Sequence, residues 1–249
     1  MLLEQTFEKL TTLQLHGMVE ALQRFTEKGA PTDMSPTDLV GILADAESAH
    51  RDNRKLQLRL KNAKLRQQAC IEDVDYRHPR GLSKPLLLEL ATSRWVAQHQ
   101  NVILTGKTGV EKSYLACALA QKACRDRHTV AYRRFSRLLD ELVQARADGT
   151  YLTALRRFAK TQGLVLDDFG LDVLGPAERK ILLDVLEDRY GVSSTVVTSQ
   201  IEPDAVIGEE TAADSICDRL VHDAHRIKLS GESIRKTRSS LNGQPKSAK

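Results

Sequence analysis

The sequence predicts an α/β fold in which a parallel sheet is flanked by helices and preceded by an all-helical N-terminal domain. Beyond residue 83, apolar strands alternate with helices, which is typical of a parallel sheet covered on both faces. Before residue 70, the apolar residues follow helical spacing only. A phosphate-binding loop pattern lies between a strand and a helix in "ILTGKTGVEKSYLACAL" (residues 103–119). The 249 residues, 41% of them hydrophobic, suit one ordinary core with a small appended domain.

The N-terminal part is expected to consist of helices. Apolar residues recur at helical spacing through residues 2–26, and "KGAPTDM" then interrupts the pattern. A second helix is expected from Pro36, because Ser35 can act as the N-cap, proline suits a first turn, and Asp38 completes a capping box.

Positive charge gathers in the helical segment that follows. Residues 51–66 contain seven basic residues and one acidic residue, a local net charge of 7 − 1 = +6, whereas the whole chain carries +4. The segment is either a solvated helix face or a helix that contacts phosphates. Together with "YRRFSR" (residues 132–137), it is the candidate for contacts to a nucleic-acid backbone, which are salt-dependent and carry little sequence information. The low aromatic content of 4% favours such contacts over base stacking.

The second part begins after the connector "YRHPRGLSK" and is expected to alternate helices and strands. Ser83 can cap the first of these helices, and Pro176 suits the first turn of a later one. The expected helices cover residues 83–95, 112–125, 136–160 with an interruption at "DGTY", 176–190, and about 211–223. The expected strands are "NVILTG", "TVAYRRF", "GLVLDD", "STVVTSQ" and "HRIKL".

The loop pattern predicts a nucleotide site. In the pattern G-x-x-x-x-G-K-[ST], backbone N–H groups wrap phosphates, the lysine reaches the terminal phosphates, and the hydroxyl holds magnesium. A helix that begins at the loop adds partial positive charge from its N-terminus. The residues expected to bind ATP are Gly106, Lys107, Thr108, Gly109, Val110, Glu111, Lys112, Ser113 and Tyr114.

A pair of acids supplies the second half of the predicted site. "GLVLDDFG" is an apolar strand closed by Asp167 and Asp168, 167 − 112 = 55 residues beyond Lys112. We expect it at the end of a neighbouring strand, where Asp167 would hold Mg²⁺ with Ser113, directly or through water. Asp168 would orient the attacking water as a catalytic residue. Two acids after a buried strand are costly unless a cation accompanies them.

Glu111 departs from the pattern, which asks for glycine at this position. Its side chain crowds the loop and brings a carboxylate close to a polyphosphate. One unit charge at ~5 Å, with an effective dielectric of ~20, costs roughly 3 kcal/mol. Lys107 offsets part of this repulsion. The sequence therefore predicts a P-loop fold with weakened ATP binding.

Segments along nearly the whole chain resemble the IstB-like ATPases, which are helpers of insertion-sequence transposition related to the DnaC helicase loaders within the AAA+ class. The resemblance rests on "LQLHGMVEAL", "LKNAKLRQQACIEDVDYR", "AQHQNVILTG", "LACALAQKACRD", "VLDDFGL", "LEDRYG", "TSQ", "ICDRLVH" and "RIKLSGESIRK". Two loop positions differ from the family, which usually has glycine at residue 111 and proline at residue 107.

The resemblance implies further roles. Gln200, or Ser199, looks like the polar sensor near the γ-phosphate. Arg219 stands where AAA+ proteins carry an arginine finger, which acts on the nucleotide of a neighbouring subunit and implies a homo-oligomer. Arg235 looks like the second sensor. ATP hydrolysis in an oligomer is implied, and Glu111 impairs it to an extent that the sequence leaves open.

The resemblance also implies a domain plan and partners. Residues 1–70 would form the helical domain for DNA and partner contacts, 71–238 the AAA+ domain, and 239–249 a disordered tail. Duplex DNA and the transposase of the same element are the implied partners, and DNA cutting would belong to the transposase. No apolar run approaches the ~20 residues of a membrane helix, and "MLLEQTFEKL" is no signal peptide, so we expect a cytoplasmic protein without membrane contacts.

Two alternatives remain. A DnaC-like helicase loader would share the nucleotide site and differ in what the N-terminal helices bind. A nucleotide-independent module that coats DNA is favoured by Glu111.

Overall fold

The structure is a computed structural model that describes residues 3–29, 34–171, 174–202, 216 and 218–232. The chain divides into two compact units, residues 1–58 and 59–249. The division lies earlier in the chain than the predicted domain boundary after residue 70.

The first unit contains α1 (Leu3–Thr12), α2 (His16–Lys28) and the first part of α3 (Pro36–Ala63). The prediction of one helix over residues 2–26 is wrong, because Gln14 adopts a left-handed conformation with φ 58° and separates two helices. The predicted capping box at the start of α3 is confirmed: the backbone N–H of Asp38 donates to Ser35 Oγ (3.1 Å), and that of Ser35 donates to Asp38 Oδ2 (3.3 Å).

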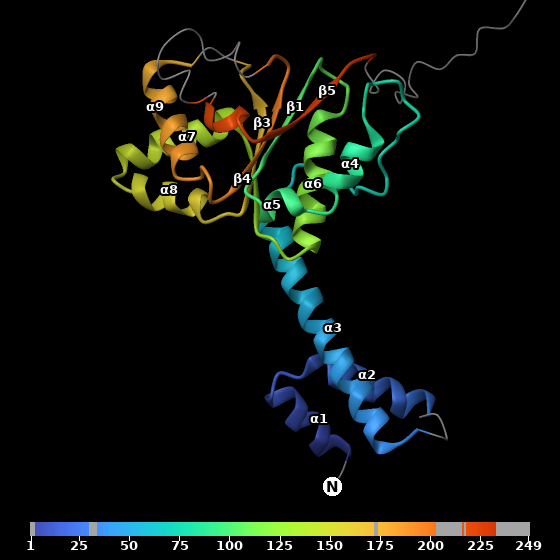
Figure 1. The fold of residues 1–249 in the computed structure, drawn as a ribbon. Coiled ribbons are helices and arrows are strands. Elements are labelled where there is room, and N and C mark those ends of the chain that lie inside the picture. Colours follow the sequence, from blue (N-terminus) through green and yellow to red (C-terminus); the bar gives the residue numbers. More distant parts are fainter. Residues whose placement is uncertain (1–2, 30–33, 172–173, 203–215, 217, 233–249) are drawn as a thin grey trace, which may run out of the picture. The chain divides into compact units, whose positions relative to one another are not determined.

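The second unit is built on a parallel sheet (Figure 1). Its strands lie in the order β2-β3-β4-β1-β5, and every described pairing is parallel. Their bounds are β1 (Asn101–Gly106), β2 (Val130–Arg134), β3 (Gly163–Phe169), β4 (Ser194–Ser199) and β5 (Ala224–Leu229). The expectation that the loop strand and the acid strand are neighbours is wrong, since β4 lies between β1 and β3.

Helices cover both faces of this sheet. Figure 1 shows α4 (Lys84–Leu90), α5 (Arg94–Ala97) and α6 (Lys112–Arg125) on one side, and α7 (Phe135–Ala147), α8 (Tyr151–Ala159) and α9 (Pro176–Glu187) on the other. Ser83 caps α4 as predicted, with its side chain accepting from the backbone of Leu86. The single helix expected over residues 83–95 is interrupted, because Ser93 is left-handed with φ 57°.

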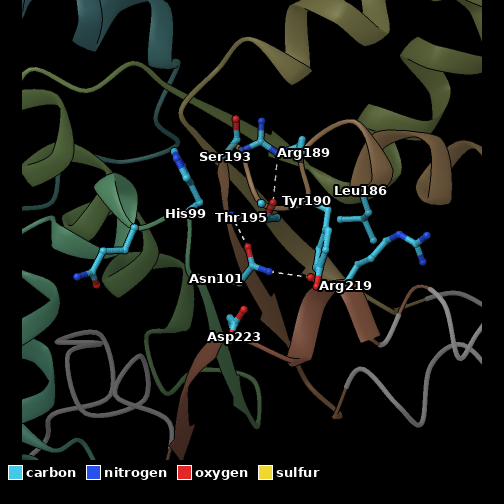
Figure 2. A pocket seen from close by; sticks show the side chains of 11 residues that line it. His99, Asn101, Leu186, Arg189, Tyr190, Ser193, Thr195, Arg219 and Asp223 are labelled. Atoms are coloured by element: carbon cyan, nitrogen blue, oxygen red, sulfur yellow. Dashed lines mark hydrogen bonds between the residues drawn. The ribbon is translucent and has the colours of Figure 1, made fainter.

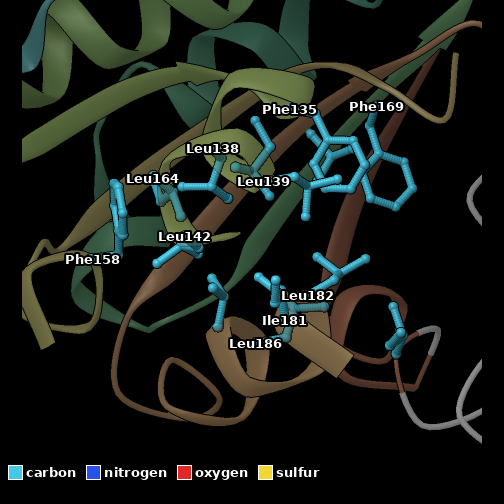
Figure 3. Packing of buried hydrophobic residues seen from close by; sticks show 14 of the residues in the cluster. Phe135, Leu138, Leu139, Leu142, Phe158, Leu164, Phe169, Ile181, Leu182 and Leu186 are labelled. Atoms are coloured by element: carbon cyan, nitrogen blue, oxygen red, sulfur yellow. The ribbon is translucent and has the colours of Figure 1, made fainter. Parts of the chain in front are cut away.

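The core on the α7 and α9 side fixes the direction of the site residues (Figure 3). Leu164 and Leu166 of β3 are buried there against α7 and α9. Because successive side chains of a strand point to opposite faces, Val165 and Asp167 point to the other face, which α6 covers. The pleat of β3 thus turns the first acid toward the helix that follows the loop.

Some predicted elements lie partly or wholly outside the described residues. Of the helix expected near residues 211–223, residues 216 and 218–221 are helical and much of the rest is not described. The tail at 239–249 also lies outside. None of the helices in the described ranges combines the length and the apolar content needed to cross a bilayer.

Candidate nucleotide site

The loop between β1 and α6 has the backbone that a phosphate cradle needs. β1 ends at Gly106 with φ 147°, and Gly109 has φ 94°, conformations that favour glycine. Lys112 begins α6, and its Nζ donates to the carbonyls of Gly106 (2.6 Å) and Lys107 (3.0 Å). The ammonium therefore lies across the mouth of the loop. Thr108 is exposed at the loop tip, whereas Val110 is fully buried and anchors the loop to the core.

Ser113 and Asp167, which are far apart in the chain, meet as the sequence predicts. Ser113 Oγ donates to Asp167 Oδ1 at 2.6 Å. Thr198 of β4 donates to the same oxygen at 2.6 Å, and Tyr132 of β2 donates to Oδ2. Burial opposes ionisation of Asp167, but the hydrogen bonds from Ser113, Thr198, Tyr132 and Arg66 outweigh it and hold the pKa of this carboxyl below its ordinary value. Asp167 is therefore a fully buried, ionised carboxylate.

Asp168 follows Asp167 and has a left-handed backbone conformation. It has φ 61°, at a register shift of the β3–β4 pairing, and its N–H donates to Thr198 Oγ1 at 3.0 Å. Bulges of this kind re-aim side chains next to functional sites. The carboxylate stays partly exposed and pairs with Arg134 at 3.1 Å and Arg66 at 3.5 Å.

The oxygens of Ser113 and Asp167 fit a magnesium ion. A hydroxyl and a carboxylate are hard oxygen ligands of the kind that Mg²⁺ takes alongside phosphate oxygens. The residues that would hold the ion are these two, and the ion would neutralise phosphate charge there. Arg66 Nη1 lies 3.2 Å from Asp167 Oδ2, so a guanidinium already places positive charge beside the acids.

Replacing Arg66 with glutamine is therefore expected to strengthen binding of Mg²⁺. The guanidinium repels a second cation at the acids, and even a solvent-screened repulsion of ~0.7 kcal/mol changes an equilibrium about threefold. The Mg²⁺ concentration that half-saturates nucleotide binding should fall by at least about threefold. Thermal unfolding with Mg²⁺ alone gives a second readout.

The matched control is Arg134→Gln, which removes a partner of Asp168 only. Its effect on the Mg²⁺ requirement should be smaller than that of Arg66→Gln. Equal Mg²⁺ requirements in the wild-type chain and Arg66→Gln would show that Arg66 does not compete with Mg²⁺ beside Asp167.

Glu111 is not a bare carboxylate facing the loop. It has φ 66° at the N-cap of α6, and its Oε2 lies 2.5 Å from Nη1 of the fully buried Arg80. The unpaired charge on which the predicted penalty was based is therefore compensated. The strength of ATP binding itself stays a prediction.

The polar residues at the end of β4 and directly after it do not all reach the acids. Ser199 Oγ donates to the carbonyl of Phe169 at 2.9 Å, and Gln200 is exposed beyond the strand. Thr198 is the β4 side chain that contacts Asp167, and sequence reasoning missed it along with Tyr132 and Arg66. The only signal for Thr198 was a hydroxyl near the end of a buried strand. Tyr114 is half-buried, with its hydroxyl 3.5 Å from the carbonyl of Cys70.

Arg219 lies at the end of the sheet where β1 begins, whereas the loop follows the other end of β1. Its carbonyl accepts from Asn101 Nδ2 at 3.0 Å, and its Nη2 donates to Glu187 Oε1 at 2.9 Å, beside the pocket of Figure 2. Asn101 begins β1 and Gly106 ends it, a span of roughly 16 Å at the usual rise per residue. Arg219 is thus not next to the loop of its own chain. Arg235 lies outside the described residues.

The two basic segments are only partly available for phosphates. Arg59 donates to the carbonyl of Cys124 at 2.9 Å, and Arg66 lies on the acids, as described above. In "YRRFSR", Tyr132 is buried and Arg133 pairs with Glu141 at 3.3 Å. The exposed cations that remain in residues 51–66 include Arg54, Lys55, Lys61 and Lys64.

Comparisons with known proteins agree with this geometry. A family described as IstB-like ATP binding protein matches residues 8–242. An insertion sequence ATP-binding protein of Sinorhizobium fredii is 47% identical over 239 residues, which cover 95% of this chain and 98% of that protein. The crystal structure of DnaI has a TM-score of 0.55 at 24% identity and covers 65% of this chain and 91% of its own. That of the DnaC helicase loader has a TM-score of 0.50 at 18% identity, with 66% and 97% covered. These two structures confirm the fold alone.

Proposed function

This chain belongs to the family of IstB-like ATP-binding proteins, and we propose that it is an ATP-dependent DNA-binding helper that directs or stimulates the transposase of an insertion sequence. The observation that carries the proposal is the contact of Ser113 with Asp167 at 2.6 Å, directly behind a lysine that lies across the mouth of the loop. Ser113 lies at the start of α6 and Asp167 lies in β3, and they meet although β1, which leads into the loop, and β3 are not neighbours in the sheet.

The site residues have separate roles in binding and hydrolysing ATP. Main-chain N–H groups of residues 106–113 bind the phosphates, and Lys112 binds the terminal ones. Ser113 and Asp167 hold Mg²⁺, which supplies charge neutralisation on the phosphates. Asp168 orients the attacking water, and Gln200 and Arg235 sense the γ-phosphate.

Arg219 completes the site of a neighbouring copy. Its distance from the loop of its own chain supports a role in trans, because a guanidinium across the sheet cannot reach the phosphates bound by the same subunit. The partly exposed side chain pairs with Glu187, an ion pair that a neighbouring phosphate can replace. ATP then promotes assembly of the homo-oligomer along duplex DNA, and hydrolysis releases or remodels it.

DNA contacts come from exposed lysines and arginines, including Lys61 and Lys64 near the end of α3. Residues 1–70 supply the contacts to DNA and the transposase. A helicase loader shares this fold, as the DnaC structure does, and would differ by capturing a helicase ring instead. A DNA-coating module without nucleotide dependence is disfavoured by the partner that Glu111 finds in Arg80.

Assembly on DNA tests this function. Particle size on duplex DNA, measured by analytical ultracentrifugation with ATP, with ADP and without nucleotide, should increase only with ATP. DNA affinity should fall roughly a hundredfold between about 50 and 200 mM salt if about four phosphates are contacted. The double variant Lys61→Ala/Lys64→Ala should weaken binding and flatten this salt dependence, whereas Lys160→Ala, at the exposed end of α8, should change neither.

Assembly of the same size without nucleotide would instead identify a coating module. Pull-down with the full chain separates the remaining readings, because a helper captures the transposase and a loader captures a helicase ring.

A further inference from the structure

The residue that breaks the loop pattern has a dedicated counter-ion. Glu111 occupies the position of the second glycine and keeps the left-handed backbone that a glycine would adopt there, with φ 66° and ψ 31°. The loop geometry is therefore retained, and what the substitution adds is a side chain with a negative charge. That carboxylate is 14% exposed and lies 2.5 Å from Arg80 Nη1.

Arg80 is held in place from several directions. Its Nη2 donates to the carbonyl of Asp75 at 2.9 Å. Its own backbone N–H donates to the carbonyl of His78, and its carbonyl accepts from the N–H of Ser230, which follows β5, both at 2.9 Å. Arg80 is thus fixed between the connector and the end of β5, close to the place where β1 passes into the loop. It is not a surface arginine that could swing away.

The burial of Arg80 favours an anionic partner. Its side chain is fully buried, and its Nε finds no acceptor within the described ranges. A buried guanidinium bonded only to carbonyls would carry uncompensated charge, which is far more costly than a buried pair. The only carboxylate paired with it at salt-bridge distance in the described part of the chain is that of Glu111.

We propose that Arg80 and Glu111 form a positioning pair that takes the place of the second loop glycine. Arg80 neutralises the Glu111 carboxylate and holds it on the connector side of the loop, so that the loop retains binding of Mg-ATP. The inference rests on the proposed ATP site and deepens it. The sequence predicted that Glu111 weakens ATP binding, so that its removal would raise the affinity. The pair predicts instead that ATP affinity does not rise without Glu111, and that the fold is weakened because Arg80 loses its counter-ion.

A double-mutant cycle tests the pair. The full-length wild-type chain, Glu111→Gln, Arg80→Met and the double variant are titrated with a fluorescent ATP analogue in Mg²⁺, and their thermal unfolding is followed without nucleotide. Arg80→Met removes the buried cation that faces the Glu111 carboxylate and should weaken binding at least about tenfold. Glu111→Gln should change affinity by less than about threefold and lower the unfolding temperature. The double variant, a neutral pair of similar shape, should return to within about threefold of wild type.

The control cycle uses Arg125 and Glu72, an exposed ion pair with the same kind of contact at 2.6 Å. Arg125→Met and Glu72→Gln should leave ATP binding unchanged. If Arg80→Met does not fold, the ATP affinities of Glu111→Gln and of the double variant still test whether Arg80 and Glu111 act as a pair. The charge-retaining Arg80→Lys should also bind within about threefold of wild type.

Two results would contradict the proposed pair while leaving the ATP site intact. In the first, the wild-type chain binds Mg-ATP and Glu111→Gln binds it about tenfold more tightly. In the second, the double variant binds Mg-ATP as weakly as Arg80→Met does. Absence of Mg-ATP binding in the wild-type chain and in every variant would overturn both the pair and the proposed function.

Discussion

Lys112→Ala is expected to weaken Mg-ATP binding by at least about a hundredfold. The ammonium is held across the mouth of the loop by the carbonyls of Gly106 and Lys107, at 2.6 and 3.0 Å. A unit charge at ~4 Å from a phosphate, with an effective dielectric of ~20, is worth roughly 4 kcal/mol, and each ~1.4 kcal/mol is a factor of ten. The measurement is a titration with a fluorescent ATP analogue at constant Mg²⁺, with circular dichroism to verify folding.

The matched control is Lys107→Ala. Lys107 belongs to the same loop, but its side chain is exposed, so solvent screens it and its loss should weaken binding less than about tenfold. Equal losses in the two variants would show that general loop charge, and not the placement of Lys112, determines affinity. Unchanged binding in Lys112→Ala would remove the lysine from the site.

Gly106→Ala is expected to destabilise the second unit strongly, whatever the nucleotide. Gly106 pairs with Leu229 where β1 meets β5, and a Cβ built there would lie 2.2 Å from the carbonyl oxygen of Leu229. Its φ of 147° adds backbone strain for any other residue. Strain and overpacking together cost at least about 3 kcal/mol. For a domain of this size that corresponds to a fall in unfolding temperature of about 6–12 °C, measured by circular dichroism.

Gly149→Ala separates the steric effect from the conformational one. Gly149 also has positive φ, 70°, but a Cβ there would meet no atom within 4 Å. Its substitution should cost only about 1 kcal/mol of left-handed strain. Similar unfolding temperatures for the two variants would contradict the close approach of β5 to the start of the loop.

Local patterns predicted the elements around the site well. The strand, loop and helix through 101–125 are found where the sequence places them, because apolar runs, glycines and an amphipathic helix are all short-range signals. The capping box of Ser35 and Asp38 is equally local. Two helix predictions were wrong because the helices are interrupted at Gln14 and Ser93. Both residues adopt left-handed conformations, which are uncommon for these residue types and give no signal in the sequence.

Contacts between distant segments could not be predicted in this way. Arg66 reaches Asp167 across 101 positions, and Arg80 reaches Glu111 across 31. No periodicity connects such partners, because Arg66 and Arg80 lie in the connector between α3 and α4, outside the regular elements, and only the folded chain brings them to the acids. Thr198 was missed for the same reason, because its role depends on β4 lying between the loop strand and the acid strand. Sequence reasoning found the two halves of the site but not the residues that join them.

The central claim is that residues 106–113 bind a triphosphate opposite Asp167. The most direct test is an experimental structure of the full chain with Mg²⁺ and a non-hydrolysable ATP analogue. The account predicts the phosphates within the loop, Lys112 Nζ at hydrogen-bonding distance from them, and the metal beside Ser113. An analogue bound elsewhere, or no bound analogue at saturating concentration, would contradict it.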